Sequence, residues 1–322
     1  MPTILNGKDS SAVSAKNRHM TQKTLKKCYS FEGKGLHTGK YATMTVKPAP
    51  VNTGIVFKRT DIGRHALVRA IVENVSDTSR STSLTQDGIT VRTVEHILSA
   101  LTGLGVDNAI IEVDNIEIPI LDGSARRYSL LIAKDGLEEQ DAERKYIEIT
   151  EPVEVKDEKT GSWIRIEPAG TFSYDVTVDF NSNVLGVQNA VWNPSVNYVN
   201  QIGQCRTFVF FHEIEYLFKN NLIKGGDVDN AIVIVEHPVT EKQLDSLSLL
   251  FDKEKLEVTD GGYLNNLSLR FKNECGRHKL LDLIGDLRLA GGFINAKITA
   301  FKPGHTINTT AARKLVEAIN AQ

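Results

Sequence analysis

The order of strand-like and helix-like stretches constrains the fold of this 322-residue chain more than any other feature. In each half, stretches in which polar and apolar residues alternate come first, and stretches with helical apolar spacing follow. The strand-like stretches lie at residues 28–50, 54–61, 108–113, 146–155, 162–169, 172–180 and 230–237. The helix-like stretches lie at residues 93–105, 126–137, 212–223, 276–286 and near the C-terminus. This order predicts α+β sheets with helices packed on them.

The charged segment "EEQDAERK" at residues 138–145 is the best candidate for a linker, because it lacks periodicity and lies near the middle of the chain. We therefore predict a first α+β domain at residues 20–140 and a second at residues 146–322. The pentapeptide "VDNAI" occurs at 106–110 and again at 228–232, which hints at an internal duplication.

The first 19 residues are polar and lack the apolar core of a signal peptide. We read residues 1–19 as a disordered tail or as a segment added to the natural chain, with Met20 as a natural start.

Composition excludes several classes of protein. Hydrophobic residues make up 41% and charged residues 24% of the chain, which is typical of a folded soluble protein. The formal net charge of −2 argues against a nucleic-acid-binding protein. No apolar run approaches the ~20 residues of a membrane-spanning helix. The three cysteines lie far apart, which argues against a disulfide scaffold and a thiolate zinc site. We therefore expect a cytoplasmic protein.

A glycine-rich turn, "GKGLHTGK" at residues 33–40, invites comparison with a phosphate-binding loop. That loop requires a glycine five residues before Gly39, where this chain has Lys34, and a Ser or Thr after Lys40, where it has Tyr41. The stretch is therefore predicted to be a hairpin, and His37 within it is given no chemical role.

The stretch "GRHKLLDLIGD" at residues 276–286 places polar side chains at helical spacing. His278 and Asp282 are four residues apart, so a helix would point both at the same region, and Asp286 lies one turn further on the same stripe. Two interpretations remain open on this spacing. One is a buried salt bridge, and the other is half of a metal site.

Two further histidines stand apart from the others in the chain. His96 lies in an otherwise apolar helix beside Glu95, and adjacent helix positions diverge by about 100°. His305 follows the turn sequence "KPG" at the end of a strand-like stretch. Catalytic zinc takes three protein ligands of the His and carboxylate type, so His96 could join His278 and Asp282. Glu95 could then act as a base toward water, although each residue could also have a structural role.

Four stretches together resemble one enzyme family: "TVEHILSALTGLGVDNAIIEVDNIEIPILDGSA", "CRTFVFFHEIEYLFKNNLIKGGDVDNA", "GRHKLLDLIGDLRLAGG" and "KPGHTINT". This sequence is similar to the UDP-3-O-acyl-N-acetylglucosamine deacetylase family of lipid A biosynthesis. The resemblance runs in order from about Thr24 to the C-terminus. Some members of that family carry a dehydratase domain after this one, whereas the sequence here ends at Gln322.

The resemblance implies a fold and an activity. The implied fold has two similar α+β domains, each a sheet layered on helices, with an insert in each and the active site between them. The implied activity is zinc-dependent hydrolysis of the N-acetyl group of UDP-3-O-acyl-N-acetylglucosamine. It releases acetate and the free amine in the committed step of lipid A synthesis. Zn²⁺ is the implied cofactor, with Fe²⁺ as an alternative, and we expect a monomer.

The resemblance also assigns roles to residues. The implied metal ligands are His96, His278 and Asp282. The implied catalytic residues are the general base Glu95, the proton donor and oxyanion stabiliser His305, its orienting carboxylate Asp286, and Thr207 near the tetrahedral intermediate. The implied substrate-binding residues are Lys279 and Lys302 near the diphosphate, Asp179 and Phe180 near the uridine, and Phe208 at the start of the second insert.

The segment at about 208–235 is predicted to form a passage for the acyl chain. Its stretch "FVFFHEIEYLF" carries more large apolar side chains than one face of a short helix buries. The alternative is that these residues fill the domain core.

For the whole chain, two further functions remain open: a zinc amidase or peptidase with another substrate, and a non-catalytic protein that binds an acyl lipid or nucleotide.

Overall fold

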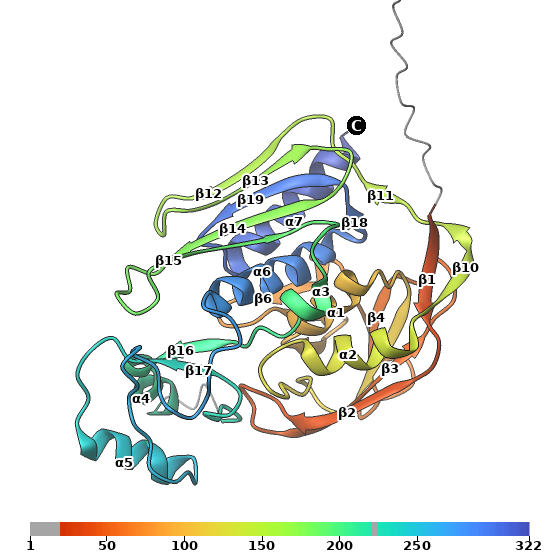
Figure 1. Ribbon diagram of the computed structural model, residues 1–322. Helices are drawn as coiled ribbons and strands as arrows, with labels where there is room; N and C mark the ends of the chain where they lie inside the picture. The colour runs from red at the N-terminus through yellow and green to blue at the C-terminus, as the bar shows by residue number, and fades with distance from the viewer. Residues whose placement is uncertain (1–19, 220–223, 322) are drawn as a thin grey trace, which may run out of the picture.

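Two five-stranded sheets enclose a layer of helices in the computed structural model of this chain, which describes residues 20–219 and 224–321 (Figure 1). The predicted tail at residues 1–19 lies outside the described residues. Part of the predicted helix at 212–223 does so too, because α4 is described over Phe211–Lys219.

The first sheet has the strand order β2-β3-β9-β4-β5. Its strands are β2 (Tyr29–Lys34), β3 (Tyr41–Pro48), β4 (Ile55–Arg59), β5 (Leu67–Arg69) and β9 (Ala109–Val113). The central strand β9 runs antiparallel to β3 and parallel to β4. Strands β2 and β3 pair antiparallel around residues 35–40, so the glycine-rich stretch forms the predicted hairpin.

The second sheet repeats this topology in the order β12-β13-β19-β14-β15. Its strands are β12 (Val153–Asp157), β13 (Ser162–Pro168), β14 (Ser173–Asp179), β15 (Val187–Trp192) and β19 (Ala296–Phe301). The central strand β19 again runs antiparallel to one neighbour, β13, and parallel to the other, β14. The predicted α+β class with two similar sheet-and-helix units is thus confirmed.

The repeated pentapeptide does not mark this duplication. Its first copy, at 106–110, leads into the central strand β9. The second copy, at 228–232, leads into β17 (Ile232–Ile234), which pairs with β16 (Phe208–Phe210) outside both five-stranded sheets. The two copies therefore occupy positions that are not equivalent.

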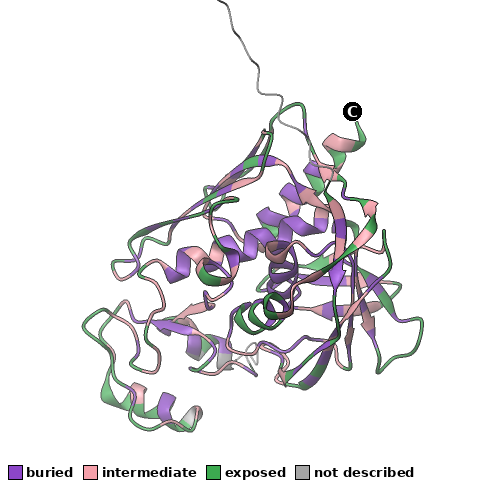
Figure 2. Ribbon diagram, turned by 45° about the vertical axis from the view of Figure 1, so that its right-hand side comes forward, coloured by how far each residue is buried: buried purple, intermediate pink, exposed green. Residues whose placement is uncertain are grey.

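Four helices lie between the sheets: α1 (Glu95–Leu104), α2 (Arg126–Asp135), α6 (Glu274–Leu287) and α7 (His305–Asn320). In each half, one helix precedes the central strand and one follows it, so α1 corresponds to α6 and α2 to α7. Helix α1 packs against α6 in the middle of the molecule, and Figure 2 shows both as largely buried.

Gly285 allows the two central helices to approach closely. A Cβ atom at this position would lie 2.1 Å from the carbonyl oxygen of Glu95. Such a distance is far below van der Waals contact, so any larger residue would force α1 and α6 apart.

Each half carries an insert beside its sheet. The first insert is a three-stranded sheet of β6 (Val75–Asp77), β7 (Ser83–Gln86) and β8 (Ile89–Arg92), after the 3-10 turn η1 (Val72–Asn74). The second contains β16, α4, β17 and α5 (Glu241–Leu250) and follows the short helix α3 (Tyr198–Gln201). The second insert has its own apolar cluster, formed by Phe211, Ile214, Val228, Val233, Val235, Leu247, Leu256 and Leu264.

The charged segment at 138–145 is mostly strand. Residues of β10 (Leu137–Glu143) pair antiparallel with β1 (Thr21–Leu25), and β11 (Tyr146–Ile147) then pairs with β18 (Phe293–Ile294), which follows the 3-10 turn η2 (Arg288–Ala290). The β1–β10 ribbon buries no residue of β10, so that strand needs no alternation of polar and apolar residues. This explains why the sequence pattern did not predict it.

Within the described part of the chain, none of the helices combines the length and the apolar content that crossing a membrane requires. The three cysteines, Cys28, Cys205 and Cys275, are all free.

Candidate active site

The three predicted metal ligands converge where α1 crosses α6. One ligand atom from each of His96, His278 and Asp282 lies within 4.8 Å of the others, and all three residues are buried. The Nε2 atoms of His96 and His278 lie 3.6 Å and 3.3 Å from Oδ1 of Asp282. Side chains from both halves of the molecule therefore point at one small region.

The polar atoms of this cluster are arranged as a cation site would require. Asp282 Oδ1 is buried and has no hydrogen-bond partner among the described residues, whereas a salt bridge joins Oδ2 to Lys279 Nζ at 3.0 Å. An unsatisfied buried carboxylate oxygen is costly unless a cation or a donor meets it. Two imidazoles and a carboxylate are ligands that suit zinc.

The environment of His278 keeps its ligand nitrogen available. The Nδ1 atom lies 3.1 Å from the carbonyl oxygen of Cys205, and in the tautomer that donates this hydrogen bond the lone pair is on Nε2. Burial lowers the pKa of His278 to about 4, although Asp282 partly opposes this shift. The imidazole is therefore neutral at pH 7, as a metal ligand must be.

Glu95 lies next to this cluster as the first residue of α1, with a side chain that is almost fully buried. Its Oε2 accepts a hydrogen bond of 3.0 Å from the backbone N–H of Thr82. Burial raises the pKa of Glu95, while the nearby His305 and His96 oppose the shift. A buried carboxylate beside a cation site can accept a proton from a reacting water.

His305 and Asp286 form a hydrogen-bonded pair across α6 and α7. The Nδ1 atom of His305 lies 3.0 Å from Oδ2 of Asp286, which is fully buried. Burial alone would lower the pKa of His305, but the carboxylates of Asp286, Asp282 and Glu95, with Asp286 contributing most, together outweigh it and raise the pKa to about 9. His305 is therefore an imidazolium at neutral pH and can donate a proton.

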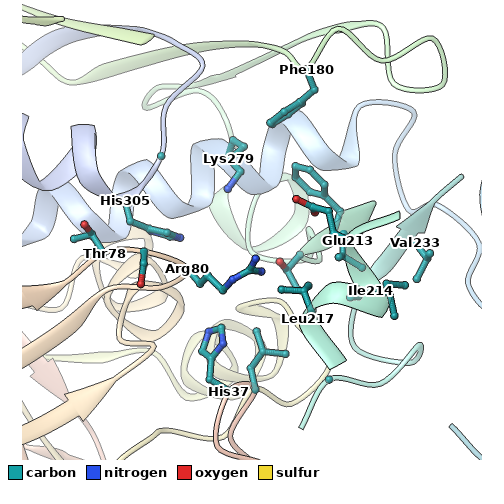
Figure 3. A pocket seen from close by; sticks show the side chains of 18 of the residues that line it. His37, Thr78, Arg80, Phe180, Glu213, Ile214, Leu217, Val233, Lys279 and His305 are labelled. Atoms are coloured by element: carbon teal, nitrogen blue, oxygen red, sulfur yellow. The ribbon is translucent and has the colours of Figure 1, made fainter. Parts of the chain in front are cut away.

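A cleft of about 550 Å³ opens beside the buried cluster, and Lys279 and His305 form part of its wall. Figure 3 shows His305, Lys279 and Arg80 toward one side, and Ile214, Leu217 and Val233 of the second insert toward the other. The cleft thus has a cationic region and an apolar region.

Four of the five predicted substrate-binding residues line this cleft, namely Phe180, Phe208, Lys279 and Lys302. Two of the predicted catalytic residues, Thr207 and His305, line it as well. Asp179 does not line it, and its carboxylate accepts a hydrogen bond from the backbone N–H of Asn181. Phe180 is 37% exposed and meets Phe208 edge to face at 5.4 Å, so its ring is free to contact a ligand.

Thr207 is held between the first half and the second insert. Its backbone N–H donates to Gly123 of the first half, and its carbonyl accepts from Ile232 of β17, both at 2.8 Å. The preceding Arg206 forms a buried ion pair with Glu274 of α6. These contacts fix the wall of the cleft at Thr207.

Three residues that the sequence patterns did not single out also reach this region. Arg80 and His37 line the cleft, and Thr82 donates to Glu95. Arg80 and Thr82 lie in the polar run "SDTSRSTS", and His37 lies in a turn. Irregular polar segments carry no periodic signal, so nothing in the sequence distinguished these residues from their neighbours.

Comparison with known proteins gives a consistent result over nearly the whole chain. A family profile described as "LpxC: UDP-3-O-acyl N-acetylglycosamine deacetylase" matches residues 22–256 and 252–317. A UDP-3-O-acyl-N-acetylglucosamine deacetylase from Saccharophagus degradans is 41% identical over 304 residues, which cover 93% of this chain and 91% of that protein. The one from Shewanella halifaxensis is 39% identical over 299 residues, covering 92% and 89%.

A longer relative shares the same region. The bifunctional enzyme LpxC/FabZ from Bacteroides thetaiotaomicron is 43% identical over 300 residues, which cover 93% of this chain. The match spans 65% of that relative's own length.

Proposed function

Because the chain belongs to the LpxC family of UDP-3-O-acyl-N-acetylglucosamine deacetylases, we propose that it catalyses the hydrolysis that gives the family its name. In this reaction the N-acetyl group of UDP-3-O-acyl-N-acetylglucosamine is released as acetate, which leaves the free amine and commits the substrate to lipid A. The observation that carries the proposal is the buried cluster of His96, His278 and Asp282, flanked by Glu95 and His305.

The resident metal in this proposal is zinc, with ferrous iron as the alternative, held by His96, His278 and Asp282. The unpartnered Oδ1 of Asp282 and the neutral His278 support this ligand set. A bound divalent ion supplies Lewis acidity, which favours attack of water on the acetyl carbonyl. One chain contributes all three ligands, so the site needs no second subunit, and we propose a monomeric enzyme.

The protein's own side chains move the protons. Glu95 takes a proton from the water whose oxygen bonds to the acetyl carbon, and the hydrogen bond from Thr82 holds the carboxylate for this step. The hydroxyl of Thr207 donates a hydrogen bond to the oxyanion that forms. His305 then donates a proton to the nitrogen as the C–N bond breaks, and Asp286 keeps His305 protonated beforehand.

The cationic region of the cleft binds the nucleotide in this proposal. Lys279 and Lys302 contact the diphosphate, while Phe180, with Asp179 beside it, contacts the uridine. The exposed ring of Phe180 and the position of both lysines on the cleft wall support this assignment.

The apolar region of the cleft takes the acyl chain, in a passage that begins at Phe208 and uses the insert at about 208–235. The apolar lining includes Val209, Ile214, Leu217, Val228 and Val233. Ile214 and Val233 belong both to this lining and to the apolar cluster of the insert, so filling a core and lining a passage are compatible roles. Phe251, beyond the predicted segment, adds to the wall.

The activity is tested directly by measuring acetate release from UDP-3-O-acyl-N-acetylglucosamine. We expect turnover that a chelator abolishes and added zinc restores. Turnover of N-acetylated peptides in place of the sugar nucleotide would indicate another amidase. Tight binding of the sugar nucleotide without acetate release would indicate a non-catalytic binding protein.

The acyl passage is tested with substrates whose acyl chain is shortened or removed. Each buried methylene contributes about 0.8 kcal/mol, so loss of four should lower kcat/KM roughly 200-fold. The metal content should not change. Equal kcat/KM for the acylated and deacylated sugar nucleotides would show that the insert only fills its own core.

A further inference from the structure

Thr82 makes hydrogen bonds both to the proposed base, Glu95, and to Asp286, the carboxylate that pairs with the proposed acid His305. It lies between β6 and β7 of the first insert and is fully buried. Its backbone N–H donates to Glu95 Oε2 at 3.0 Å, and its hydroxyl donates to Asp286 Oδ1 at 2.6 Å. Its carbonyl accepts from the N–H of Val94, directly before α1. One residue thus contacts the proposed base and the carboxylate that orients the proposed acid.

The hydroxyl of Thr82 fixes how the Asp286 carboxylate is turned. Oδ2 of that carboxylate meets His305 at 3.0 Å and accepts from Asn308 at 2.9 Å. Among the described residues, Thr82 supplies the one side-chain hydrogen bond to Oδ1. Without it the carboxylate would be anchored at a single oxygen and could rotate, and the imidazole of His305 would follow.

Neighbouring contacts hold this part of the insert in place. Thr78, four residues earlier, hydrogen-bonds the hydroxyl of Thr306, which directly follows His305. Rotation about χ1 is restricted in a β-branched side chain. The direction of the Thr82 hydroxyl therefore depends on where the backbone of the insert is held. The first insert therefore contacts the surroundings of His305 at two places, through Thr78 to Thr306 and through Thr82 to Asp286.

We propose that Thr82 is a positioning residue, which through its hydroxyl orients Asp286 and so aims His305 at the leaving nitrogen. This inference rests on the proposed deacetylase activity. It adds a role for the first insert, which belongs to the opposite half from Asp286 and His305.

The test is Thr82→Val, which keeps the side-chain shape and the backbone N–H to Glu95 but removes the hydroxyl. The matched control is Thr24→Val. Thr24 is also buried and its hydroxyl donates to the carbonyl of Asn108 at 2.8 Å, but it lies in β1 and does not line the cleft. Thr82→Val loses one buried hydrogen bond of the hydroxyl. Thr24→Val loses two, because the hydroxyl oxygen of Thr24 also accepts from the backbone N–H of Ala49 at 3.0 Å, so the control perturbs its surroundings at least as much.

We expect Thr82→Val to lower kcat on the order of 10- to 100-fold, the usual effect of losing an orienting partner, while KM and metal content stay near wild type. Thr82→Ser, which keeps the hydroxyl, should restore most of the rate. Thr24→Val should lose stability but keep kcat. Wild-type kcat in Thr82→Val, or an equal fall in Thr24→Val, would overturn the proposal.

A double mutant distinguishes whether Thr82 acts through His305 or acts on the reaction independently of it. In a His305→Ala background, Thr82→Val should change kcat by less than about twofold, because both changes remove the same function. A further loss as large as that in the His305-containing enzyme would overturn the proposal.

A spectroscopic readout keeps this test separate from the test of the activity. The downfield Nδ1–H proton resonance of His305, assigned with His305→Gln, should shift or broaden in Thr82→Val and not in Thr24→Val. An unchanged resonance in Thr82→Val would overturn the positioning role. Absence of acetate release by the wild-type enzyme would instead overturn the proposed function.

Discussion

Helices α1 and α6 occupy equivalent places in the two halves but contribute differently to the site. Each precedes the central strand of its sheet, and each packs on the other. Helix α1 brings polar groups at its first turn, Glu95 and His96, and is otherwise mostly apolar. Helix α6 carries His278, Asp282 and Asp286 at successive turns along one stripe. The repeated architecture provides the frame, and the chemistry arises where the two copies differ.

The difference follows from where each helix meets its neighbours. Helix α1 presents its N-terminal end to the site, after Thr93, a β-branched residue with φ of +62°. A positive φ is rare for a β-branched residue. The hydroxyl of Thr93 donates a hydrogen bond of 2.8 Å to the carboxylate of Glu117, which is buried. Helix α6 is instead buried along nearly all its length. Residues four positions apart lie on one face of a helix, so His278, Asp282 and Asp286 all face the site.

The contribution of α1 is tested most strongly by Glu95→Gln. If α1 supplies the base, kcat should fall by about 10² to 10⁴, the usual effect of removing a general base. The amide can still accept the hydrogen bond from Thr82, so metal content and KM should be retained. Loss of the metal together with activity would show that α1 supplies a ligand or support at Glu95 rather than a base.

The contribution of α6 and α7 is tested by pH. The pKa of His305 is raised to about 9, so activity that needs the imidazolium should fall as pH rises through about 9. In Asp286→Asn the pKa of His305 should fall, because the carboxylate that raises it most is removed, so the alkaline limb should move to lower pH. Where the working pH lies above the shifted limb, kcat should fall about tenfold for each unit of that difference.

The same shift predicts a pH-dependent stability. Because the folded-state pKa of His305 lies above its unfolded value, the stabilisation is complete below about pH 6.5 and is lost as pH rises through 9. Urea unfolding of wild type and Asp286→Asn at pH 6 and pH 10 measures it. A stability difference between the two proteins that does not shrink at pH 10 would contradict the assignment.

The close crossing of α1 and α6 is tested by Gly285→Ala. The added Cβ would meet the backbone of Glu95, so we expect a loss of about 1–3 kcal/mol in the free energy of unfolding. Gly170→Ala is the control, since a Cβ there meets no atom within 4 Å, and it should change stability by less than about 1 kcal/mol. Equal stability of the two variants would mean that the helices do not need this approach.

The sequence predicted the α+β class because the alternation and helical spacing of apolar residues report burial directly. It did not predict β10, because none of the residues of that strand is buried and the strand therefore needs no apolar face. The topology that makes the two halves alike depends on pairings between distant strands, such as β9 with β4 and β19 with β14. Those pairings leave no local pattern, and the repeated pentapeptide pointed to the wrong positions.

From spacing alone, the sequence predicted only the part of the site that lies on one helix, α6. The spacing of His278 and Asp282 indicated a shared face, and the structure places them together. His96 and His305 come from other elements, and here the family resemblance, not the spacing, favoured their inclusion. Thr82 could not be predicted, because it is one threonine in a polar run and its contact with Asp286 spans 204 positions of the chain.

In the proposed site, one metal ion is shared by the two halves of the molecule, and its presence is measured by mass spectrometry of the metal content in matched variants. Wild type should hold about one equivalent of zinc or iron, as three protein ligands imply. His96→Ala in α1 and Asp282→Asn in α6 should each lose it while remaining folded. Retention of a full equivalent by either variant, or its absence from active wild-type enzyme, would contradict the account.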